Sequence, residues 1–533
     1  MTKATTESPF RLKPVTPISQ TQSLCPECFA ILEAEVYEQA GKIWIRKSCA
    51  KHGEFNELYW GSSDIYQRAK RYARDGKGVD NPFVSKQDPT CPIDCGLCKL
   101  HTSHTALGNI VLTNRCDLNC WYCFFFAEKA GYVYEPSLNQ IRSMVRSLRN
   151  EKPVPCNAVQ LTGGEPTLRE DLLDIIKICR EEGIDHVQLN TDGIRLSTDP
   201  TLAEKVRKAG VNTIYLSYDG TTLEKNPKNH REIPGILDNC KRAGVGIVLV
   251  PTVIKGTNDS EVGSIIRFAL KNLGVIRGVN FQPISIVGRV PERERERFRI
   301  TIPDVMIKIE EDFAGEISCD DFYPIPSCMP FSNFVEALTH EREYELSTHF
   351  ACGMATYVFL DGEKIIPMPR FVDVDGFFEY LDEKAVDLRE GASKYAVGIK
   401  LLYSLFTKYV DKSKAPKRLN VSRILFDALL KHDYRALGIL QHNSLFIGLM
   451  HFQDLYNWDI ERAKRCAIHY ATPDERIIPF CTFNVIPEWY RDKVQKEYGM
   501  PISEWEKKTG RKLSDDLYRR IVSSEPLKAP QAS

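Results

Sequence analysis

The chain between Leu107 and Pro283 alternates short apolar, β-branched runs with amphipathic stretches of helical period. The helical stretch over 171–179 is closed by Gly183, and the one over 202–209 is closed by Gly210. A strand and a helix repeated about every 30 residues are typical of βαβ units. Six such units predict an α/β fold with a partial (β/α)6 barrel that is open at one side. The predicted strands span 109–113, 158–162, 186–190, 213–217, 246–250 and 278–282.

Polar and glycine residues follow these predicted strands. Cys116 comes soon after the first strand, and Gly163-Gly164-Glu165-Pro166 follows the second. Barrels of this kind carry their chemistry at the C-terminal ends of the strands. The sequence therefore predicts an active site there, which would also include three residues from the ends of later strands: Asn190, Ser217 and Thr252.

Two cysteine motifs share the spacing C-x3-C-x2-C, which can supply three of the four thiolates of a [4Fe–4S] cluster. The motif of Cys116, Cys120 and Cys123 directly follows the first barrel strand. A zinc site or a chance group of thiols is the alternative there. The other motif has Gly96 and Leu97 before its last cysteine and polar residues after it, and it predicts an auxiliary cluster or, alternatively, a structural zinc. Its ligands are Cys91, Cys95 and Cys98, and the fourth is open among Cys319, His101, His104 and a substrate.

A third metal site is predicted near the N-terminus. Strand-like alternation over 34–48, with a turn at Ala40-Gly41, suggests a hairpin. A CxxC and a CxxH motif flank it, which suits one tetrahedral ion, either Zn or Fe. The predicted ligands are Cys25, Cys28, Cys49 and His52, although His52 beside Gly53 could simply be a turn residue.

The region after residue 310 has a different character. Its apolar stretches over 395–410, 424–430 and 445–452 are interpreted as amphipathic helices, which usually build a core. They could instead form an apolar tunnel or a membrane-docking face for a lipid. Four cysteines in this region are predicted to hold a second auxiliary cluster, the alternative being isolated buried thiols: Cys328, Cys352, Cys466 and Cys481.

Composition limits the remaining possibilities. The 533 residues suggest about three domains, predicted at 1–85, 86–310 and 311–533. Lysine plus arginine and aspartate plus glutamate are both 71, so the net charge is zero and nothing favours nucleic acid. Seventeen cysteines in metal-type spacings favour a reducing cytoplasm. The polar stretch 1–14 resembles no signal peptide, and no apolar run of about 18 residues occurs, so any membrane contact is expected to be peripheral.

The Cys116–Cys123 motif, with an aromatic residue before its last cysteine and a GGEP about forty residues later, resembles the radical S-adenosylmethionine (SAM) superfamily. That resemblance implies a [4Fe–4S] cluster whose fourth iron chelates the amino and carboxylate groups of SAM. The cluster reduces the sulfonium and releases methionine and a 5′-deoxyadenosyl radical. In the superfamily, the backbone of the GGEP element, here Gly163, Gly164 and Glu165, contacts the SAM amino group. By position, Asn190, Ser217 and Thr252 are candidates for contacts to the ribose and carboxylate of SAM.

Over roughly residues 20–500 the motifs CPxC, CxxHG, CPxxCGxC, CxLxCxxC, PxPSC and IPFC resemble archaeal tetraether lipid synthase and its relatives, which were earlier linked to pterin methylation. The resemblance implies a radical SAM barrel with a small N-terminal metal domain and an α-rich C-terminal auxiliary-cluster domain. It also implies coupling of terminal methyl carbons of isoprenoid chains in a diether lipid. An auxiliary cluster would hold the first carbon radical, and a low-potential donor such as ferredoxin would supply electrons. The alternatives are a radical methylase of a dihydropterin and a multi-cluster electron-transfer protein.

Overall fold

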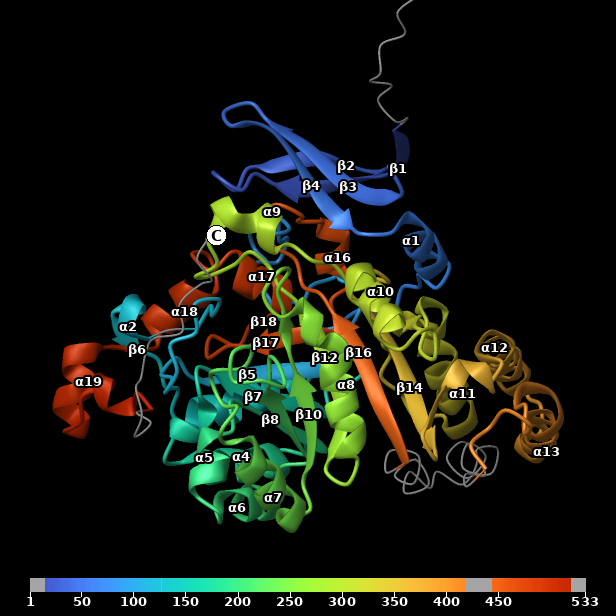
Figure 1. Cartoon of the computed structure of the whole chain (residues 1–533). Coiled ribbons are helices and arrows are strands. Elements are labelled where there is room, and N and C mark those ends of the chain that lie inside the picture. Colours follow the sequence, from blue (N-terminus) through green and yellow to red (C-terminus); the bar gives the residue numbers. More distant parts are fainter. Residues whose placement is uncertain (1–14, 126, 418–442, 519–533) are drawn as a thin grey trace, which may run out of the picture.

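The computed structural model describes residues 15–125, 127–417 and 443–518. A four-stranded antiparallel sheet at the N-terminus lies above the rest of the molecule in Figure 1. The predicted hairpin is confirmed as β2 and β3, and both residues of its turn, Ala40 and Gly41, have positive φ. This sheet and the helix after it comprise β1 (Thr16–Leu24), β2 (Ile31–Gln39), β3 (Lys42–Cys49), β4 (Gly53–Trp60) and α1 (Ser63–Lys70).

The six predicted barrel strands are confirmed, and they form one parallel sheet in the order β12-β10-β9-β8-β7-β5. Each strand carries buried β-branched and leucine side chains, because helices cover its outer face. The strands are β5 (Leu107–Thr113), β7 (Ala158–Gly163), β8 (His186–Thr191), β9 (Thr213–Ser217), β10 (Gly246–Val250) and β12 (Ile276–Pro283). Short β11 (Thr252–Val253) pairs with β12.

Helices wrap the outside of these strands (Figure 1). The segment before β7 begins with a capping box, in which Ser137 and Gln140 satisfy each other's backbone N–H groups. The covering helices are α3 (Leu138–Arg149), α4 (Leu172–Glu181), α5 (Ile194–Thr198), α6 (Leu202–Ala209), α7 (Ile233–Ala243), α8 (Val262–Lys271) and α10 (Ile302–Asp312). Helix α9 (Arg295–Phe298) lies instead under the N-terminal sheet, where Arg295 pairs with Glu57 of β4.

Strands from the C-terminal region join the same sheet at both edges. β16 pairs parallel with β12, and β17 pairs parallel with β5. The helix predicted over 445–452 is therefore wrong, because Leu445, Ile447 and Leu449 alternate on one buried face of a strand. These strands are β13 (Tyr323–Pro324), β14 (Gly353–Asp361), β15 (Lys364–Pro367), β16 (Ser444–Met450), β17 (Ile468–Ala471) and β18 (Ile477–Pro479).

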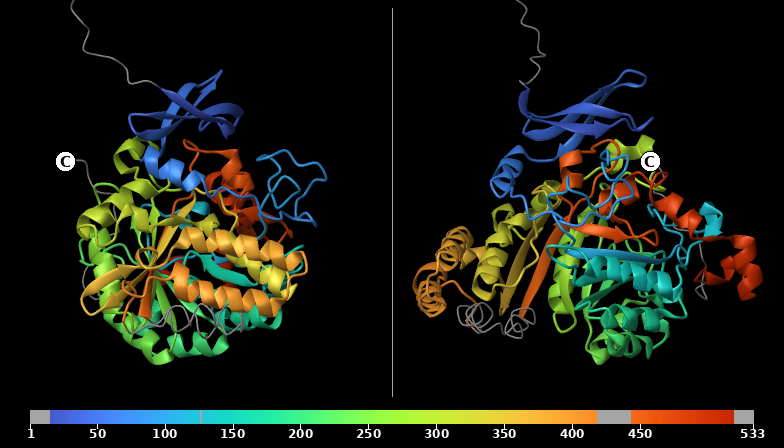
Figure 2. Two further views of the ribbon diagram at one scale, coloured as in Figure 1. Left: turned by 90° about the vertical axis from the view of Figure 1, so that its right-hand side faces the viewer. Right: turned by 180° about the vertical axis from the view of Figure 1, so that it is seen from behind.

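Three helices lie outside β14 as a lateral layer: α11 (Met329–Thr339), α12 (Val374–Arg389) and α13 (Lys394–Ser404) (Figure 2). The stretch predicted as a helix over 395–410 forms α13 and a π-helical turn over 405–409. Val397 and Leu401 pack inward, whereas Tyr395, Ile399 and Tyr403 are at least 70% exposed. The stretch predicted over 424–430 lies outside the described residues.

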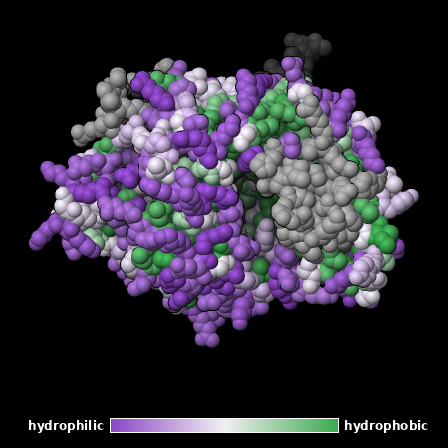
Figure 3. All heavy atoms as spheres, turned by 90° about the horizontal axis from the view of Figure 1, so that it is seen from below, coloured by the Kyte–Doolittle hydropathy of each residue, from purple (hydrophilic) through white to green (hydrophobic). Residues whose placement is uncertain are grey.

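The remaining short elements lie around the upper part of the molecule and on the side of α19 in Figure 1. They are α2 (Ala127–Ala130), β6 (Tyr132–Val133), α16 (Ile460–Lys464), α17 (Phe480–Val485), α18 (Arg491–Glu497), β19 (Met500–Pro501) and α19 (Ile502–Thr509). Seen from below, the face formed by α5, α6 and α7 is mainly hydrophilic and is hollowed beside these helices (Figure 3). Of the helices in the described ranges, none is long and apolar enough to cross a membrane.

Candidate active site and metal centres

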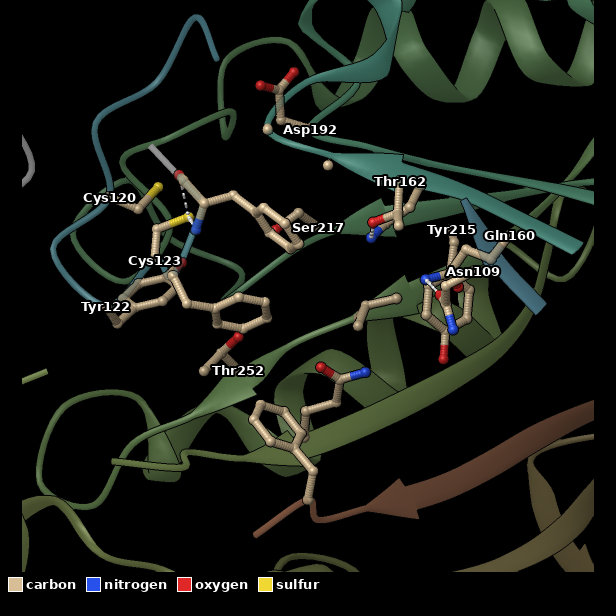
Figure 4. A pocket seen from close by; sticks show the side chains of 18 of the residues that line it. Asn109, Cys120, Tyr122, Cys123, Gln160, Thr162, Asp192, Tyr215, Ser217 and Thr252 are labelled. Carbon is tan, nitrogen blue, oxygen red and sulfur yellow. Dashed lines mark hydrogen bonds between the residues drawn. The ribbon is translucent and has the colours of Figure 1, made fainter. Parts of the chain in front are cut away.

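A cavity of about 410 Å³ opens inside the barrel, at the C-terminal ends of its strands. That volume falls within the range of about 300–1,000 Å³ that is usual for small-molecule sites. All three cysteines of the Cys116 motif line the cavity, together with Gly163, Gly164, Glu165, Asn190, Ser217 and Thr252. In Figure 4 the labelled cysteines lie at one end of the cavity, and Asn109, Gln160 and Tyr215 lie together at the other.

The Cys116 motif forms a loop that leaves the end of β5. The backbone N–H of Leu118 donates to Cys116 Sγ over 3.4 Å, and that of Phe125 donates to Cys123 Sγ over 3.3 Å. Burial raises the pKa of the Cys120 thiol to about 12 and raises those of Cys116 and Cys123 as well. A cation in the loop would offset this cost, because a metal deprotonates the thiols that coordinate it. The three residues fit a cluster that leaves one iron without a protein ligand.

Gly163 and Gly164 have a structural role in addition to the predicted contact with SAM. A Cβ atom on Gly163 would lie 2.1 Å from the carbonyl oxygen of Thr113, and one on Gly164 would lie 2.0 Å from that of Arg115. Only glycine allows this approach, and Gly163 also has a φ of +141°. The pair therefore fixes the end of β7 against the backbone immediately before Cys116.

The side chain of Glu165 connects the ends of β7 and β8. Its carboxylate accepts hydrogen bonds from Thr167, from the Thr191 hydroxyl (2.8 Å) and from the Asp192 backbone N–H (2.9 Å). Burial, with a smaller effect from the charge of Asp192, raises the Glu165 pKa to about 8. The carboxylate thus orders the strand ends, whereas the superfamily resemblance concerned the backbone of this element.

The three polar residues predicted at later strand ends all reach the cavity, where they already have protein partners. Asn190 Nδ2 donates to Thr162 Oγ1 over 3.2 Å, and the Thr252 backbone N–H donates to Asp219 over 3.0 Å. Ser217 Oγ accepts from Lys228 Nζ over 2.6 Å. Their contacts with SAM stay a prediction.

Sequence reasoning missed a buried polar group built around Lys228. Its Nζ donates to Asp219 over 2.6 Å and to the Tyr122 hydroxyl over 3.1 Å, and Tyr122 also donates to Asp219. The side chain of Lys228 is only 2% exposed. This group joins the loop after β9 to the aromatic residue before Cys123, so it holds the cysteine loop in place. The Asp219-Gly220 turn at a strand end was the available signal.

A band of uncharged hydrogen-bonding side chains crosses the inner end of the cavity, and it was also missed. Gln160 donates to Asn109 over 3.0 Å, Gln188 donates to Gln160, and Asn280 donates to the Tyr215 hydroxyl. All five line the cavity from different strands. We call Asn109, Gln160, Gln188, Tyr215 and Asn280 the amide band. The signal was an Asn, Gln or Tyr within five of the six apolar runs.

The N-terminal site has the geometry of a mononuclear centre. The ligand atoms of Cys25, Cys28, Cys49 and His52 all lie within 4.8 Å of one another. Cys28 and Cys49 Sγ are 4.0 Å apart, and Cys25 Sγ is 3.4 Å from His52 Nδ1. A tetrahedral ion with metal–sulfur bonds of about 2.3 Å requires sulfurs about 3.8 Å apart. Backbone N–H groups of Lys51 and His52 help lower the Cys49 pKa to about 6, which favours the thiolate.

Comparison with known proteins agrees with both sites. The Radical SAM superfamily model matches residues 110–269, and the model of the HMPTM N-terminal zinc ribbon domain matches residues 17–61. The 7,8-dihydro-6-hydroxymethylpterin dimethyltransferase of Methanocaldococcus jannaschii is 46% identical over 501 residues, which cover 92% of this chain and 97% of that protein. The chain belongs to the family of this protein. It is a radical SAM enzyme, so SAM and a [4Fe–4S] cluster are its cofactors.

More distant matches cover only part of this radical SAM enzyme. GTP 3′,8-cyclase of Aquifex aeolicus is 29% identical over 224 residues, 41% of this chain and 66% of that enzyme. The solved structure of methylornithine synthase has a TM-score of 0.31 and 15% identity, covering 40% of this chain and 64% of that one.

The predicted lipid-coupling activity is wrong. The archaeal relative that spans nearly the whole chain is named a pterin dimethyltransferase and not a lipid synthase. The structure gives a physical reason for doubting a lipid tunnel, because the exposed residues of α13 do not line the cavity. Of the apolar stretches in the described ranges, 445–452 reaches the cavity through Met450 and Phe452.

The radical SAM enzyme has a second, smaller cavity in which Cys91, Cys95 and Cys98 meet. Cys95 Sγ donates to Thr482 Oγ1 over 3.3 Å, and the Cys95 backbone N–H donates to the Tyr490 hydroxyl. Lys464 lines the same cavity, and its charge helps to lower the pKa of Cys91. The three thiols therefore lie on a loop outside the barrel, held against α16 and α17.

Of the four C-terminal cysteines, the structure brings three together. The charges of Cys481 and Cys352 both raise the pKa of Cys466, in addition to the effect of burial. The buried guanidinium of Arg462 donates to Cys352 Sγ over 3.4 Å. Phe480, next to Cys481, and Ile468, two residues from Cys466, line the main cavity.

Cys328 does not join that group. Its thiol donates to the Ile325 carbonyl, and its charge acts on Tyr357, five residues along from Cys352. The charges that act on the thiols of Cys466 and Cys481 include that of Cys352 and not that of Cys328. The predicted four-cysteine cluster is therefore corrected to a group of Cys352, Cys466 and Cys481, with Cys328 apart from it at the start of α11. The sequence could not show which thiols meet, because they come from distant segments of the chain.

Proposed function

We propose that this radical SAM enzyme methylates a reduced pterin, 7,8-dihydro-6-hydroxymethylpterin or a close analogue. The name of the 46% identical relative supports this substrate. The observation on which we rest the proposal is the amide band at the inner end of the barrel cavity. A pterin is a flat heterocycle with hydrogen-bond donors and acceptors along its edge, which amides match. An alkyl chain would leave unpaired those donors and acceptors that the band residues do not use among themselves, at a cost of about 1–3 kcal/mol each.

Aromatic side chains at the other wall of the cavity favour a flat ligand as well. Phe452 and Phe480 lie 5.1 Å apart in a T-shaped arrangement, and Tyr470 is stacked on Phe480 at 5.4 Å. All three line the cavity. The aromatic side chains can stack on the face of a ring, and the amide band can hydrogen-bond to its edge, so together they would orient a flat ligand.

The residues fit the cofactors of the superfamily. Cys116, Cys120 and Cys123 would hold the cluster, and SAM would lie between it and Gly163–Glu165. When bound, the cluster and SAM supply a 5′-deoxyadenosyl radical that can abstract hydrogen from an unactivated C–H bond. In net terms a C–H bond of the pterin breaks, a C–CH3 bond forms, and the hydrogen leaves with 5′-deoxyadenosine. A methyl donor and an external low-potential electron donor must supply the carbon and the electrons.

The protein's own residues would position and shield this reaction. The Lys228, Asp219 and Tyr122 group fixes the cysteine loop relative to β9, and Glu165 fixes β7 relative to β8. The amide band would hold the substrate at the end of the cavity opposite the labelled cysteines (Figure 4). Phe124 and Phe125 line the cavity beside Cys123 and exclude water from the side where the radical would form.

The direct test uses anaerobically purified and reconstituted full-length enzyme with SAM, a low-potential reductant and 7,8-dihydro-6-hydroxymethylpterin. We expect pterin-dependent formation of 5′-deoxyadenosine, and a product heavier by one or two methylene units in mass spectrometry. SAM labelled with deuterium in its methyl group identifies the carbon source. If the pterin neither stimulates 5′-deoxyadenosine formation nor gains mass, the proposal fails.

A pair of variants separates substrate recognition from SAM cleavage. Gln160→Leu removes the central member of the amide band, so we expect methylation to fall at least tenfold while pterin-independent cleavage of SAM persists. Cys120→Ala should abolish both reactions. A Gln160→Leu enzyme that methylates the pterin normally would mean that the amide band does not bind it.

A further inference from the structure

The C-x3-C-x2-C motif outside the barrel lacks an obvious fourth ligand, and the structure favours one of its candidates. Cys91, Cys95, Cys98 and His101 all line the same small cavity beside Lys464 of α16. We infer that this motif holds an iron–sulfur cluster whose fourth protein ligand is the imidazole Nδ1 of His101. The inference concerns a site distinct from the barrel, so it does not depend on the pterin.

The local backbone brings His101 back toward the cysteines. The His101 backbone N–H donates to the Cys98 carbonyl over 2.9 Å, which closes a tight turn. The four residues therefore follow the spacing C-x3-C-x2-C-x2-H and return to one point. All three thiols line one cavity at that point, together with His101.

The hydrogen bonds of His101 determine which ring nitrogen can bind a metal. Its Nε2 lies 2.7 Å from the Cys466 carbonyl oxygen. A carbonyl oxygen only accepts, so Nε2 carries the proton and Nδ1 has a lone pair. Within residues 15–125, 127–417 and 443–518, Nδ1 has no hydrogen-bond partner. Metal-bound histidines usually donate their other ring N–H to such a carbonyl, which fixes the ring and raises its basicity.

Further hydrogen bonds hold this tautomer. His469 Nε2 lies 3.1 Å from His101 Nε2, and His469 Nδ1 lies 2.9 Å from the Thr105 hydroxyl. With His469 accepting from His101, its Nδ1 must carry a proton and donate to Thr105. Thr105 in turn is held by Glu151, whose carboxylate accepts from the Thr105 backbone N–H over 2.7 Å. Both histidines are buried, so the array stays in place.

The other protein candidates do not fit. His104 Nε2 accepts from the Glu345 backbone N–H over 3.0 Å, so its Nδ1 carries the proton and cannot coordinate a metal. Cys319 lies elsewhere: its backbone N–H donates to Glu310 over 2.8 Å and its carbonyl accepts from Arg68. Neither residue lines the cavity of the three thiols.

This assignment would also bring the Cys91 motif within one hydrogen bond of the C-terminal cysteine group. The carbonyl that orients His101 belongs to Cys466, whose thiol lies in the group with Cys352 and Cys481. One hydrogen bond and one residue would then join the two sites. Such a path suits electron transfer between clusters, and each end would sense the redox state of the other.

The test is pulsed EPR on reduced full-length enzyme purified anaerobically, with histidine labelled by ¹⁵N. To remove the signal of the radical SAM cluster, Cys116, Cys120 and Cys123 are all replaced by alanine in the background. We expect a strong ¹⁵N coupling from one ring nitrogen on a cluster signal. In the same background, His101→Cys should keep its iron and sulfide and lose that coupling completely.

Two further variants guard against a folding artefact. His104→Gln serves as the matched control, since it is a buried histidine three residues away and should leave the coupling unchanged. His101→Ala should lose up to about four iron and four sulfide ions. The inference is overturned if the coupling survives in His101→Cys, or if a protein with full iron and sulfide content at this site shows no histidine coupling.

Discussion

The two C-x3-C-x2-C motifs of this enzyme have the same spacing and different surroundings. Cys116–Cys123 begins at the end of β5 and opens onto the barrel cavity, whereas Cys91–Cys98 lies on a loop packed against α16 and α17. The first lies beside buried carboxylates, Asp117, Glu165 and Asp192. The second is followed along the chain by two buried histidines, His101 and His104, of which His101 lines its cavity. The shared spacing determines how three thiolates can bind a cluster. The surrounding fold determines which other group can reach the remaining iron.

The largest expected difference between the motifs is functional. Cys120→Ala should reduce 5′-deoxyadenosine formation to background, because it removes the cluster that SAM must contact. Cys95→Ala should lose about four iron ions and still cleave SAM. Iron and sulfide assays together with 5′-deoxyadenosine measurement check both variants. Equal loss of SAM cleavage in Cys95→Ala, with the radical cluster still visible by EPR, would contradict the separation of roles.

The carboxylates at the barrel site predict a loss of stability as pH rises. Burial raises the Glu165 pKa to about 8 from an unfolded value near 4.5, so the folded state keeps a proton that the unfolded state releases. The contribution of Glu165 to the free energy of unfolding is complete below pH 4.5 and is lost as pH rises through 8. At 1.36 kcal/mol per pKa unit, this loss is up to about 5 kcal/mol. Glu165→Gln should flatten that decline in the apparent unfolding midpoint. An unchanged pH profile would show that Glu165 is ionised in the fold.

The histidines beside the second motif predict the opposite response. Burial lowers the His104 pKa to about 4 from an unfolded value near 6.5. The fold therefore holds His104 neutral, and its contribution is complete above pH 6.5 and lost as pH falls through 4, by up to about 3 kcal/mol. His104→Gln keeps an acceptor for the Glu345 N–H and should weaken the acid-induced fall of the unfolding midpoint. A variant as acid-sensitive as the parent would contradict this.

Another part of the chain packs closely against one glycine at each motif. Alanine variants of these two glycines can therefore be compared directly. A Cβ on Gly164 would lie 2.0 Å from the Arg115 carbonyl, and one on Gly96 would lie 2.7 Å from the Phe83 carbonyl. Each alanine variant should cost about 1–3 kcal/mol. We expect Gly164→Ala to alter the SAM-dependent EPR signal and Gly96→Ala to alter the auxiliary signal alone. Gly274→Ala is the control, because its nearest neighbour would be 3.9 Å away.

The smallest effects are expected at cysteines that the structure leaves apart from both motifs. Cys328→Ala and Cys319→Ala should leave the iron content unchanged and alter stability by about 1 kcal/mol or less. Cys466→Ala, by contrast, should lose a cluster's iron if its group with Cys352 and Cys481 holds one. Iron analysis of the three variants decides this, and loss of iron in Cys328→Ala would return that residue to the ligand set.

The barrel strands were predictable because buried parallel strands are short apolar runs with turn signals at their ends. The hairpin of the N-terminal sheet and its four predicted ligands were equally local, since two knuckles and a turn need no distant partner. The helix predicted over 445–452 was wrong because a short apolar run is compatible with either a helix or a buried strand. Its identity as β16 depends on β12 and β14 lying at either side, which the run itself does not encode.

The amide band and the Lys228 group were missed because each member comes from a different strand or loop. Asn109, Gln160 and Gln188 are ordinary polar residues in separate runs, and only the register of β5, β7 and β8 makes them neighbours. The prediction of a lipid substrate was wrong for the same reason. The apolar C-terminal stretches are visible in the sequence, whereas the hydrogen-bonding lining of the cavity forms only when the strands pair.

By itself, the sequence determined the radical SAM motif, the strand–helix alternation and the N-terminal metal ligands, because each is set by spacing along a few neighbouring residues. The tertiary structure alone decided that β16 and β17 extend the barrel sheet, that Cys328 stands apart from the other three C-terminal cysteines, and that His101 rather than His104 lines the cavity of the Cys91 motif. Those outcomes depend on which carbonyls and N–H groups from distant segments meet each side chain, and burial makes such hydrogen bonds obligatory.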